Sequence, residues 1–385
     1  MSLGPSDAMQ RAREEFPFLE TRAYLNTAAV ALGSRRLASA YQTFVDAWTD
    51  GGFDFIRAEH AADASREAFA RILGVSATHV ALIASVSAAA GLVAAQFVGA
   101  AAGESLVIGE QEYSSNHFPW RQLAARGYDI RQVAFRGGGL DPDALRAAVD
   151  GGTRLIALSA VQTATGHRSD LAAVSAIARS VGAWLFVDGS QAVGAVDLAR
   201  ELPCIDFLAT SDHKFLLNAA RGMGYFYIRP ELQKQILPLG AGWKAGRAPL
   251  ESFFGPRMEL SPTASRFDAS ISWLAAIGDE VCLGHLEEIG PAAIYAWNRE
   301  LAGILRQALE DAGIPPLAMP PANRSHIVAV PLGEKDLATI LAILRSRGVV
   351  CAARDGNLRL SVHFYNNLTD VERAVAALAD AMRSG

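Results

Sequence analysis

Two short stretches place reactive side chains at the ends of apolar runs. Asp188 and Gln191 close the run in "AWLFVDGSQ", and Ser211, His213 and Lys214 close the run in "FLATSDHK". The chain has four lysines, and this one is followed by the apolar residues "FLL". An amine in apolar, partly desolvated surroundings loses its proton more easily and becomes a better nucleophile. The sequence therefore predicts covalent chemistry at Lys214.

Further polar and aromatic side chains follow other apolar runs. Ser87 comes after "HVALIAS", Tyr113 after "SLVIGE" and Gln162 after "RLIALSAV". Hydroxyls at a helix N-terminus bind phosphate, a buried carboxylate keeps a pyridine nitrogen protonated, and an aromatic ring stacks on a planar cofactor. Pyridoxal 5'-phosphate (PLP) is the ligand that uses all these groups together with a lysine. The pattern therefore predicts a PLP site.

The elements that must position these residues are strands. From about residue 79, seven strand-length apolar runs alternate with amphipathic helical patterns. Runs that are apolar on both faces are typical of a parallel sheet covered by helices. In such a sheet, ligand-binding side chains gather at the carboxyl ends of the strands. We therefore expect an α/β fold with a large, doubly wound domain built on a mostly parallel seven-stranded sheet.

A Gly/Pro-rich stretch between residues 239 and 256 ends the alternation of strand and helix patterns. A long helical pattern follows from about residue 274 to 313, and then short strands and two helices in an α+β layout. At 385 residues the chain also exceeds what one hydrophobic core usually organises. We expect an N-terminal segment over residues 1–28 that packs on the small domain and active site, a large PLP-binding domain over 29–260, and a small α+β domain over 261–385.

Composition excludes several other classes of protein. A net charge of −5 and a pI near 5.9 argue against nucleic-acid binding, which needs a basic face. Residues 80–103 carry no charge, but their small residues and missing aromatic flanks favour a strand and a buried helix over a membrane span. Three widely spaced cysteines and the lack of an apolar leader predict reduced thiols, no metal site and a cytoplasmic protein.

The segments "VDGSQAVGAVDL" and "TSDHKFL" resemble the class V aminotransferase family of fold-type I PLP enzymes, and the resemblance covers nearly the whole chain. It implies that Lys214 forms the Schiff base with the cofactor and that Asp188 holds the pyridine nitrogen. It also implies contacts of Gln191 and Gln162 with the phenolic oxygen, of Ser211, His213 and the Val86–Ser87 turn with the phosphate, of Tyr113 with the ring face, and of Arg359 with the substrate carboxylate.

Each of these residues has a structural alternative when it is taken singly. Asp188 alone fits a turn, Lys214 a strand-end lysine whose amine reaches solvent, and Arg359 a surface ion pair. Tyr113 fits core packing as well as stacking on a ring. The matched positions of Asp188 and Lys214 favour the cofactor interpretation, because both alternatives would have to occur together by chance.

Departures from the family pattern lead us to expect that the protein is not a cysteine desulfurase. Desulfurases of the family that this chain resembles carry a nucleophilic cysteine on a loop shortly before the C-terminal Arg-x-Ser strand. Here "CAARDGNLRLS" leaves almost no loop between Arg354 and Arg359. Cys351 is expected to be a structural thiol within a strand. The stretch after Lys214 is closer to the epimerase-like branch. Ser270 or Ser272 stands where the family often has a threonine that reaches the neighbouring subunit's phosphate.

The resemblance implies a PLP-dependent enzyme that acts on a small amino acid through a Cα carbanion, nominally an aminotransferase. An epimerase or racemase, or a C–S lyase catalysing β- or γ-elimination, is the alternative on the same scaffold. A non-catalytic sensor is disfavoured, because a site that has lost its activity need not keep Asp188, Lys214 and Arg359 together. A homodimer with active sites at the subunit interface is also implied.

Overall fold

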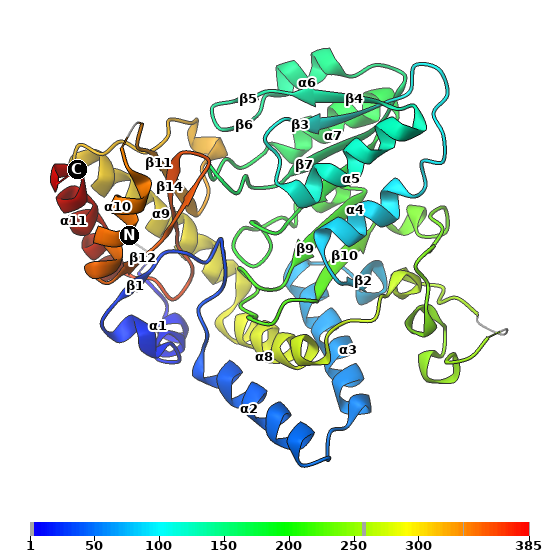
Figure 1. Ribbon diagram of the computed structural model, residues 1–385, viewed down its shortest axis with the longest axis horizontal. Coiled ribbons are helices and arrows are strands. Elements are labelled where there is room, and N and C mark those ends of the chain that lie inside the picture. Colours follow the sequence, from blue (N-terminus) through cyan, green and yellow to red (C-terminus); the bar gives the residue numbers. More distant parts are fainter. Residues whose placement is uncertain (1–3, 256–258, 334, 385) are drawn as a thin grey trace.

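The computed structural model describes residues 4–255, 259–333 and 335–384. Its central feature is a seven-stranded sheet, and each of the seven predicted runs supplies one strand (Figure 1). In spatial order the strands are β2 (Val80–Ile83), β10 (Gly224–Ile228), β9 (Phe207–Ser211), β8 (Trp184–Asp188), β7 (Thr153–Ser159), β3 (Ser105–Gly109) and β4 (Asp129–Val133). Only β10 runs antiparallel to its neighbours.

The sheet separates two apolar cores, because alternate side chains of a strand point to opposite faces. In β8, Leu185 and Val187 enter one core and Phe186 enters the other. Helices cover both faces, with α4 and α5 on one side and α7 on the other (Figure 1). The predicted α/β fold, doubly wound around a mostly parallel sheet, is confirmed.

The helices begin and end largely where the sequence signals them. Asp170 caps α7 by accepting a hydrogen bond from the Ala173 amide, and Gly182 ends that helix with a φ of 73°. The helices are α1 (Asp7–Arg13), α2 (Arg35–Thr49), α3 (Phe55–Leu73), α4 (Val86–Ala94), α5 (Phe118–Arg121), α6 (Pro142–Ala148), α7 (Leu171–Val181), α8 (Trp273–Ile289), α9 (Pro291–Asp311), α10 (Leu337–Ser346) and α11 (Leu368–Ser384).

The C-terminal part has an antiparallel sheet in the order β11 (Ile327–Pro331), β14 (Asn357–Ser361), β13 (Ala352–Arg354). The long helical pattern over 274–313 forms two helices, because Gly290 adopts a φ of 93° and Pro291 begins α9. The N-terminal strand β1 (Ala23–Tyr24) pairs in parallel with β12 (Val349–Val350). The domain boundaries expected after residues 28 and 260 stay predictions. A short hairpin joins β5 (Phe135–Arg136) to β6 (Gly139–Leu140).

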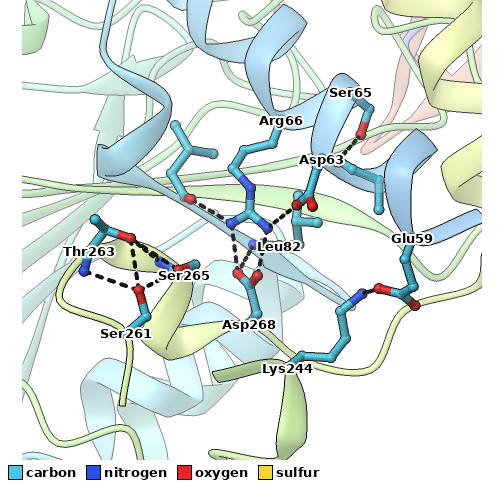
Figure 2. Close-up of polar contacts among 12 residues, drawn as sticks. Glu59, Asp63, Ser65, Arg66, Leu82, Lys244, Ser261, Thr263, Ser265 and Asp268 are labelled. Atoms are coloured by element: carbon cyan, nitrogen blue, oxygen red, sulfur yellow. Dashed lines mark hydrogen bonds and ion pairs between the residues drawn. The ribbon is translucent and has the colours of Figure 1, made fainter. Parts of the chain in front are cut away.

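A buried ion pair ties the start of the C-terminal part to the large sheet (Figure 2). Asp268 accepts two hydrogen bonds from the Arg66 guanidinium of α3, at 3.0 and 2.6 Å, and one from the Leu82 amide of edge strand β2, at 2.8 Å. The segment after Asp268 carries Ser270 and Ser272. Ser272 caps α8, whereas Ser270 is exposed.

The uncharged segment over 80–103 forms β2 and α4, as expected. Among the described residues, no helix has the length and apolar character to cross a bilayer. The cytoplasmic location stays a prediction.

Candidate active site

A cavity of about 180 Å³ opens at the carboxyl ends of the central strands. Seven of the ten predicted site residues line it: Val86, Tyr113, Asp188, Ser211, His213, Lys214 and Arg359. Strand register explains the convergence. Asp188, the last residue of β8, lies opposite Ala209 of β9, so the two segments that follow leave the sheet side by side.

Lys214 lies in the floor of this cavity, three residues beyond β9. Burial lowers the pKa of its amine to about 8, Asp188 acts in the opposite direction, and Arg359 lowers the pKa further. The amine lies 5.5 Å from the centre of the Tyr113 ring, which is 48% exposed. Tyr113 therefore faces the cavity instead of the core, and the lysine is poised to react as a neutral amine near pH 8.

Asp188 is a buried carboxylate that, among the described residues, accepts a hydrogen bond only from a nearby backbone amide. Its Oδ1 atom accepts from the Ser190 amide at 2.8 Å, and the side chain is 5% exposed. The same carboxylate raises the pKa of Lys214, so the two groups share one electrostatic environment. A carboxylate in this position can hold a proton on a cofactor nitrogen.

Arg359 comes from the middle strand of the small sheet and is almost fully buried. Its Nη1 atom donates to the carbonyl and hydroxyl oxygens of Thr163, both at 2.9 Å. Burial lowers its pKa to about 10, with Arg354 acting in the same direction. Thr163 thus binds one nitrogen of the guanidinium, and the remaining N–H groups can bind an anion.

Several buried polar atoms that line this cavity have no hydrogen-bond partner among the described residues. They are Ser211 Oγ and the Nε and Nη2 atoms of Arg359. Buried polar groups in proteins are nearly always satisfied, so such atoms around one cavity indicate a polar ligand. A hydroxyl and an arginine beside a lysine and a carboxylate are the groups that PLP and an amino acid require, so the residues present fit this cofactor.

Three predicted residues do not line the cavity. Ser87 is exposed and its hydroxyl lies 3.0 Å from that of Ser85, because Ser85 occupies the capping position of α4. Gln191 donates to the Ala28 carbonyl and the Thr163 hydroxyl at 3.0 and 2.8 Å. Gln162 donates to Glu112 at 2.6 Å. Gln191 thus contacts two residues that line the cavity, Ala28 and Thr163, without lining it itself.

His213 contributes no positive charge to the cavity near neutral pH. Burial lowers its pKa to about 4, with Lys214 and Arg221 acting in the same direction. Its carbonyl oxygen accepts from the Ala31 amide at 2.9 Å, which brings the N-terminal residues Ala28 and Ala29 over the site.

Sequence reasoning missed several residues that line the cavity. They are Ala28, Ala29, Ser85, Ser115, Thr163, Ser190, Arg221 and Arg354. Ser85 had a signal, since it precedes the α4 pattern as a helix cap. Arg221 and Arg354 had none, because each reaches the cavity only through the packing of loops that are distant in sequence.

The family model for aminotransferase class-V matches residues 24–374. The chain belongs to this family. The predicted PLP cofactor is thereby confirmed at the level of the family, and the roles of individual residues stay predictions.

Known proteins similar to this chain span nearly its full length. A cysteine desulfurase of Klebsiella pneumoniae (strain 342) is 29% identical, over 96% of this chain and 97% of the relative. YcbU of Bacillus subtilis (strain 168), an uncharacterized aminotransferase, is 23% identical over 96% of this chain and 97% of the relative. A structure of mutant C-DES with glycine covalently linked to its PLP cofactor superposes with a TM-score of 0.84 at 19% identity, over 96% of this chain and 99% of that one.

The expectation that this chain is not a cysteine desulfurase is wrong as a conclusion from sequence, because its full-length relatives include cysteine desulfurases. It rested on the short connection between Arg354 and Arg359 and on Cys351, a partly buried thiol whose pKa is raised to about 12 by burial. Cys351 lies between β12 and β13 and not within a strand as expected. The position of one cysteine does not decide whether the site cleaves a C–S bond. The placement near the epimerase-like branch stays a prediction.

Proposed function

We propose that the protein is a PLP-dependent enzyme that cleaves the Cβ–S bond of a small sulfur-containing amino acid. The observation that carries the proposal is the placement of Lys214, whose amine has a pKa lowered to about 8, in one cavity with Asp188 and Arg359. The full-length cysteine desulfurase relatives favour C–S cleavage over the transamination expected from the family name.

Each residue has one task in this proposal. PLP, when bound, supplies the electron sink for the pair left at the substrate Cα. Lys214 holds the cofactor and, once released as a neutral amine, accepts the Cα proton. Arg359, held by Thr163, orients the substrate carboxylate through its free N–H groups. Asp188 keeps a proton on the cofactor nitrogen. The electron pair left at Cα would then form a Cα=Cβ double bond as the Cβ–S bond breaks with its own pair on sulfur, which would take up a proton and leave as sulfide. Water would release the remaining carbon skeleton as a keto acid and ammonia.

The test is a panel of amino acids offered to the PLP-loaded protein, scored for sulfide, keto acid and inverted stereocentre. We expect sulfide from L-cysteine or cysteine persulfide from L-cystine, and neither product from Lys214→Ala. Lys244→Ala is the matched control, since Lys244 is also buried but pairs with Glu59. Keto acid formed from alanine without sulfide would replace this proposal by transamination, for which YcbU is the precedent. An inverted stereocentre would favour the epimerase alternative.

We further propose a homodimer. The support is a group of exposed apolar side chains between residues 237 and 254, an arrangement that marks interaction surfaces. They are Leu237, Leu239, Leu250, Phe253 and Phe254, the last being 88% exposed. Light scattering on the purified chain should give twice the monomer mass. Phe254→Asp should shift it toward monomer, whereas Leu368→Asp, on the exposed start of α11, should not. A fully active monomer would contradict the proposal.

A further inference from the structure

Arg221 reaches the cavity because β10 returns antiparallel between β2 and β9. Gly224, the first residue of β10, lies opposite Ile83 on one side and Ser211 on the other. The residues just beyond these three points therefore leave the same edge of the sheet together. Ser85 follows β2, His213 follows β9, and Arg221 comes just before β10. All three residues line the cavity.

The backbone on both sides of Arg221 is anchored. The Ala220 amide donates to the Tyr41 hydroxyl at 3.2 Å and to Asn218 Oδ1 at 3.1 Å. On the other side, the Gly222 carbonyl accepts from the Ser272 amide at 3.4 Å. Two elements that are distant in sequence, α2 and the start of α8, thus fix the segment from which the arginine projects.

Asn218 strengthens this anchoring from within the fold. Its Nδ2 atom donates to the Ala275 carbonyl at 2.8 Å and to Asp279 Oδ1 at 2.7 Å. Because Asn218 lies between Lys214 and Arg221 in the sequence, the same contacts hold both basic residues in place.

The charge of Arg221 acts on the residues around the lysine. It contributes a lowering of the pKa values of Asp212, His213 and Lys214. Arg354 lowers the pKa values of Arg359 and Lys214. Within the described part of the chain, Arg221 has no recorded ion pair with a carboxylate.

The end of the cavity near Arg221 needs a cation if it is to hold a phosphate group. A phosphate ester carries about −1.5 to −2 charge at pH 7. Ser211 offers a free hydroxyl and α4 offers the partial positive charge of its N-terminus, but His213 is neutral near pH 7 because its pKa is lowered to about 4. Lys214 is reserved for the cofactor aldehyde. Arg221 is the remaining full positive charge at this end.

We propose that Arg221 is a binding residue for the cofactor's phosphate, acting with Ser211 and the N-terminus of α4. This inference rests on the proposed function, since it assigns a residue to the same cofactor.

The test compares PLP with pyridoxal, which lacks only the phosphate. Dissociation constants of both are measured by absorbance for the full chain freed of cofactor, in wild type, Arg221→Ala, Arg221→Lys and Arg354→Ala. Because a charge-assisted hydrogen bond to the phosphate is lost, Arg221→Ala should weaken PLP binding at least about tenfold more than it weakens pyridoxal binding. Arg221→Lys should recover part of the loss. Arg354→Ala, another cavity arginine, should leave the ratio of the two constants as in wild type.

A second readout does not involve the lysine or the cofactor ring. Inorganic phosphate, at matched ionic strength against chloride, should raise the melting temperature of the wild-type apoprotein and raise it less for Arg221→Ala. An unchanged PLP-to-pyridoxal ratio in Arg221→Ala, or an equal loss for both ligands, would overturn the inference. Failure of the wild type to bind either ligand would instead overturn the proposed function.

Discussion

At the scale of single residues, Lys214 is governed by opposing charges. Asp188 stabilises the protonated amine, whereas burial, Arg359 and Arg221 favour the neutral form, and the balance lowers its pKa to about 8. A neutral amine is what both attachment to an aldehyde and acceptance of a Cα proton require. The site thus prepares its nucleophile by desolvation and uses the carboxylate to limit the shift.

This balance predicts a pH profile with opposite shifts in two variants. The rate of reductive methylation of Lys214, followed by peptide mass spectrometry of the apoprotein, should rise with pH and level off above about pH 8, because only the neutral amine reacts. Asp188→Asn removes a charge that raises the pKa, so its midpoint should fall. Arg359→Met removes one that lowers it, so its midpoint should rise. Shifts of the same sign in both variants would contradict this account.

Residues that close a strand could be predicted from sequence, and residues that depend on loop packing could not. Asp188, Ser211 and Lys214 follow apolar runs, so the edge of the sheet where they meet is determined once the strands are recognised. Arg221 lies seven residues after Lys214, and only the return of β10 brings it back to the cavity. The resemblance implied a phosphate contact for the Val86–Ser87 turn, whereas Ser85 occupies the capping position of α4 and Ser87 is exposed.

At the scale of elements, the segment after β8 packs closely against the backbone that follows Lys214. Gly194 has a φ of 86°, and a Cβ atom built on it would lie 2.4 Å from the carbonyl oxygen of Phe215, the residue after Lys214. The same oxygen lies 3.1 Å from Nε2 of the buried His363. Only glycine fits between these groups without moving the lysine segment.

Gly194→Ala should therefore destabilise the fold and disturb the site together. The control is Gly182→Ala at the end of α7, which has a similar φ of 73° but open space around it. The control should cost about 1–2 kcal/mol in unfolding free energy from backbone strain alone. Gly194→Ala should cost more and also change the affinity for PLP. Equal costs, with PLP affinity unchanged in both, would show that the close approach has no effect on the site.

The ion pair of Arg66 with Asp268 makes a second prediction about elements, since it joins α3, β2 and the segment before α8 (Figure 2). Asp268→Ala leaves a buried guanidinium with the Val80 carbonyl at 3.1 Å and, among the described carboxylates, only the exposed Asp63 at 3.1 Å, so unfolding in urea should show a loss of about 3–5 kcal/mol. Asp143→Ala breaks the exposed pair with Arg146 and should cost less than about 1 kcal/mol. Similar losses in the two variants would mean that the buried pair does not hold these elements together.

The strands were predictable because they are buried on both faces, so each reads as a continuous apolar run. Gly290 and Pro291 signal the break between α8 and α9 in the sequence. The helical pattern that continues on both sides nevertheless led to the prediction of one long helical region. The pairing of β1 with β12 had no local signal, because two residues on each side are too few to show a period.

At the scale of the whole molecule, three buried histidines link stability to pH. Burial lowers the pKa of His285 to about 4 and those of His326 and His363 to about 3. In the unfolded chain each titrates near pH 6.5, so the unfolded state binds more protons below that pH. Their contribution to stability is present above about pH 6.5 and is lost progressively as the pH falls toward about 3.

Each histidine should therefore lower the unfolding free energy by about 1 kcal/mol per pH unit on acidification from pH 7 to pH 5, whereas the buried carboxyls of Glu112, Asp212 and Asp279, whose pKa values are raised by burial, act in the opposite direction. Urea titrations at several pH values measure this slope. His326→Gln, which removes one titrating group, should reduce the slope even if it lowers stability overall. A slope that stays the same in this variant would show that His326 does not carry the effect.

The central claim is that Lys214 holds a PLP cofactor, and peptide mapping after borohydride reduction tests it most directly. The protein loaded with PLP is reduced, digested and analysed by mass spectrometry for the lysine that carries the pyridoxyl group. We expect the label on Lys214, no label in Lys214→Ala, and no label on the buried, Glu59-paired Lys244. A label on Lys244, or a reducible chromophore that persists in Lys214→Ala, would contradict the account.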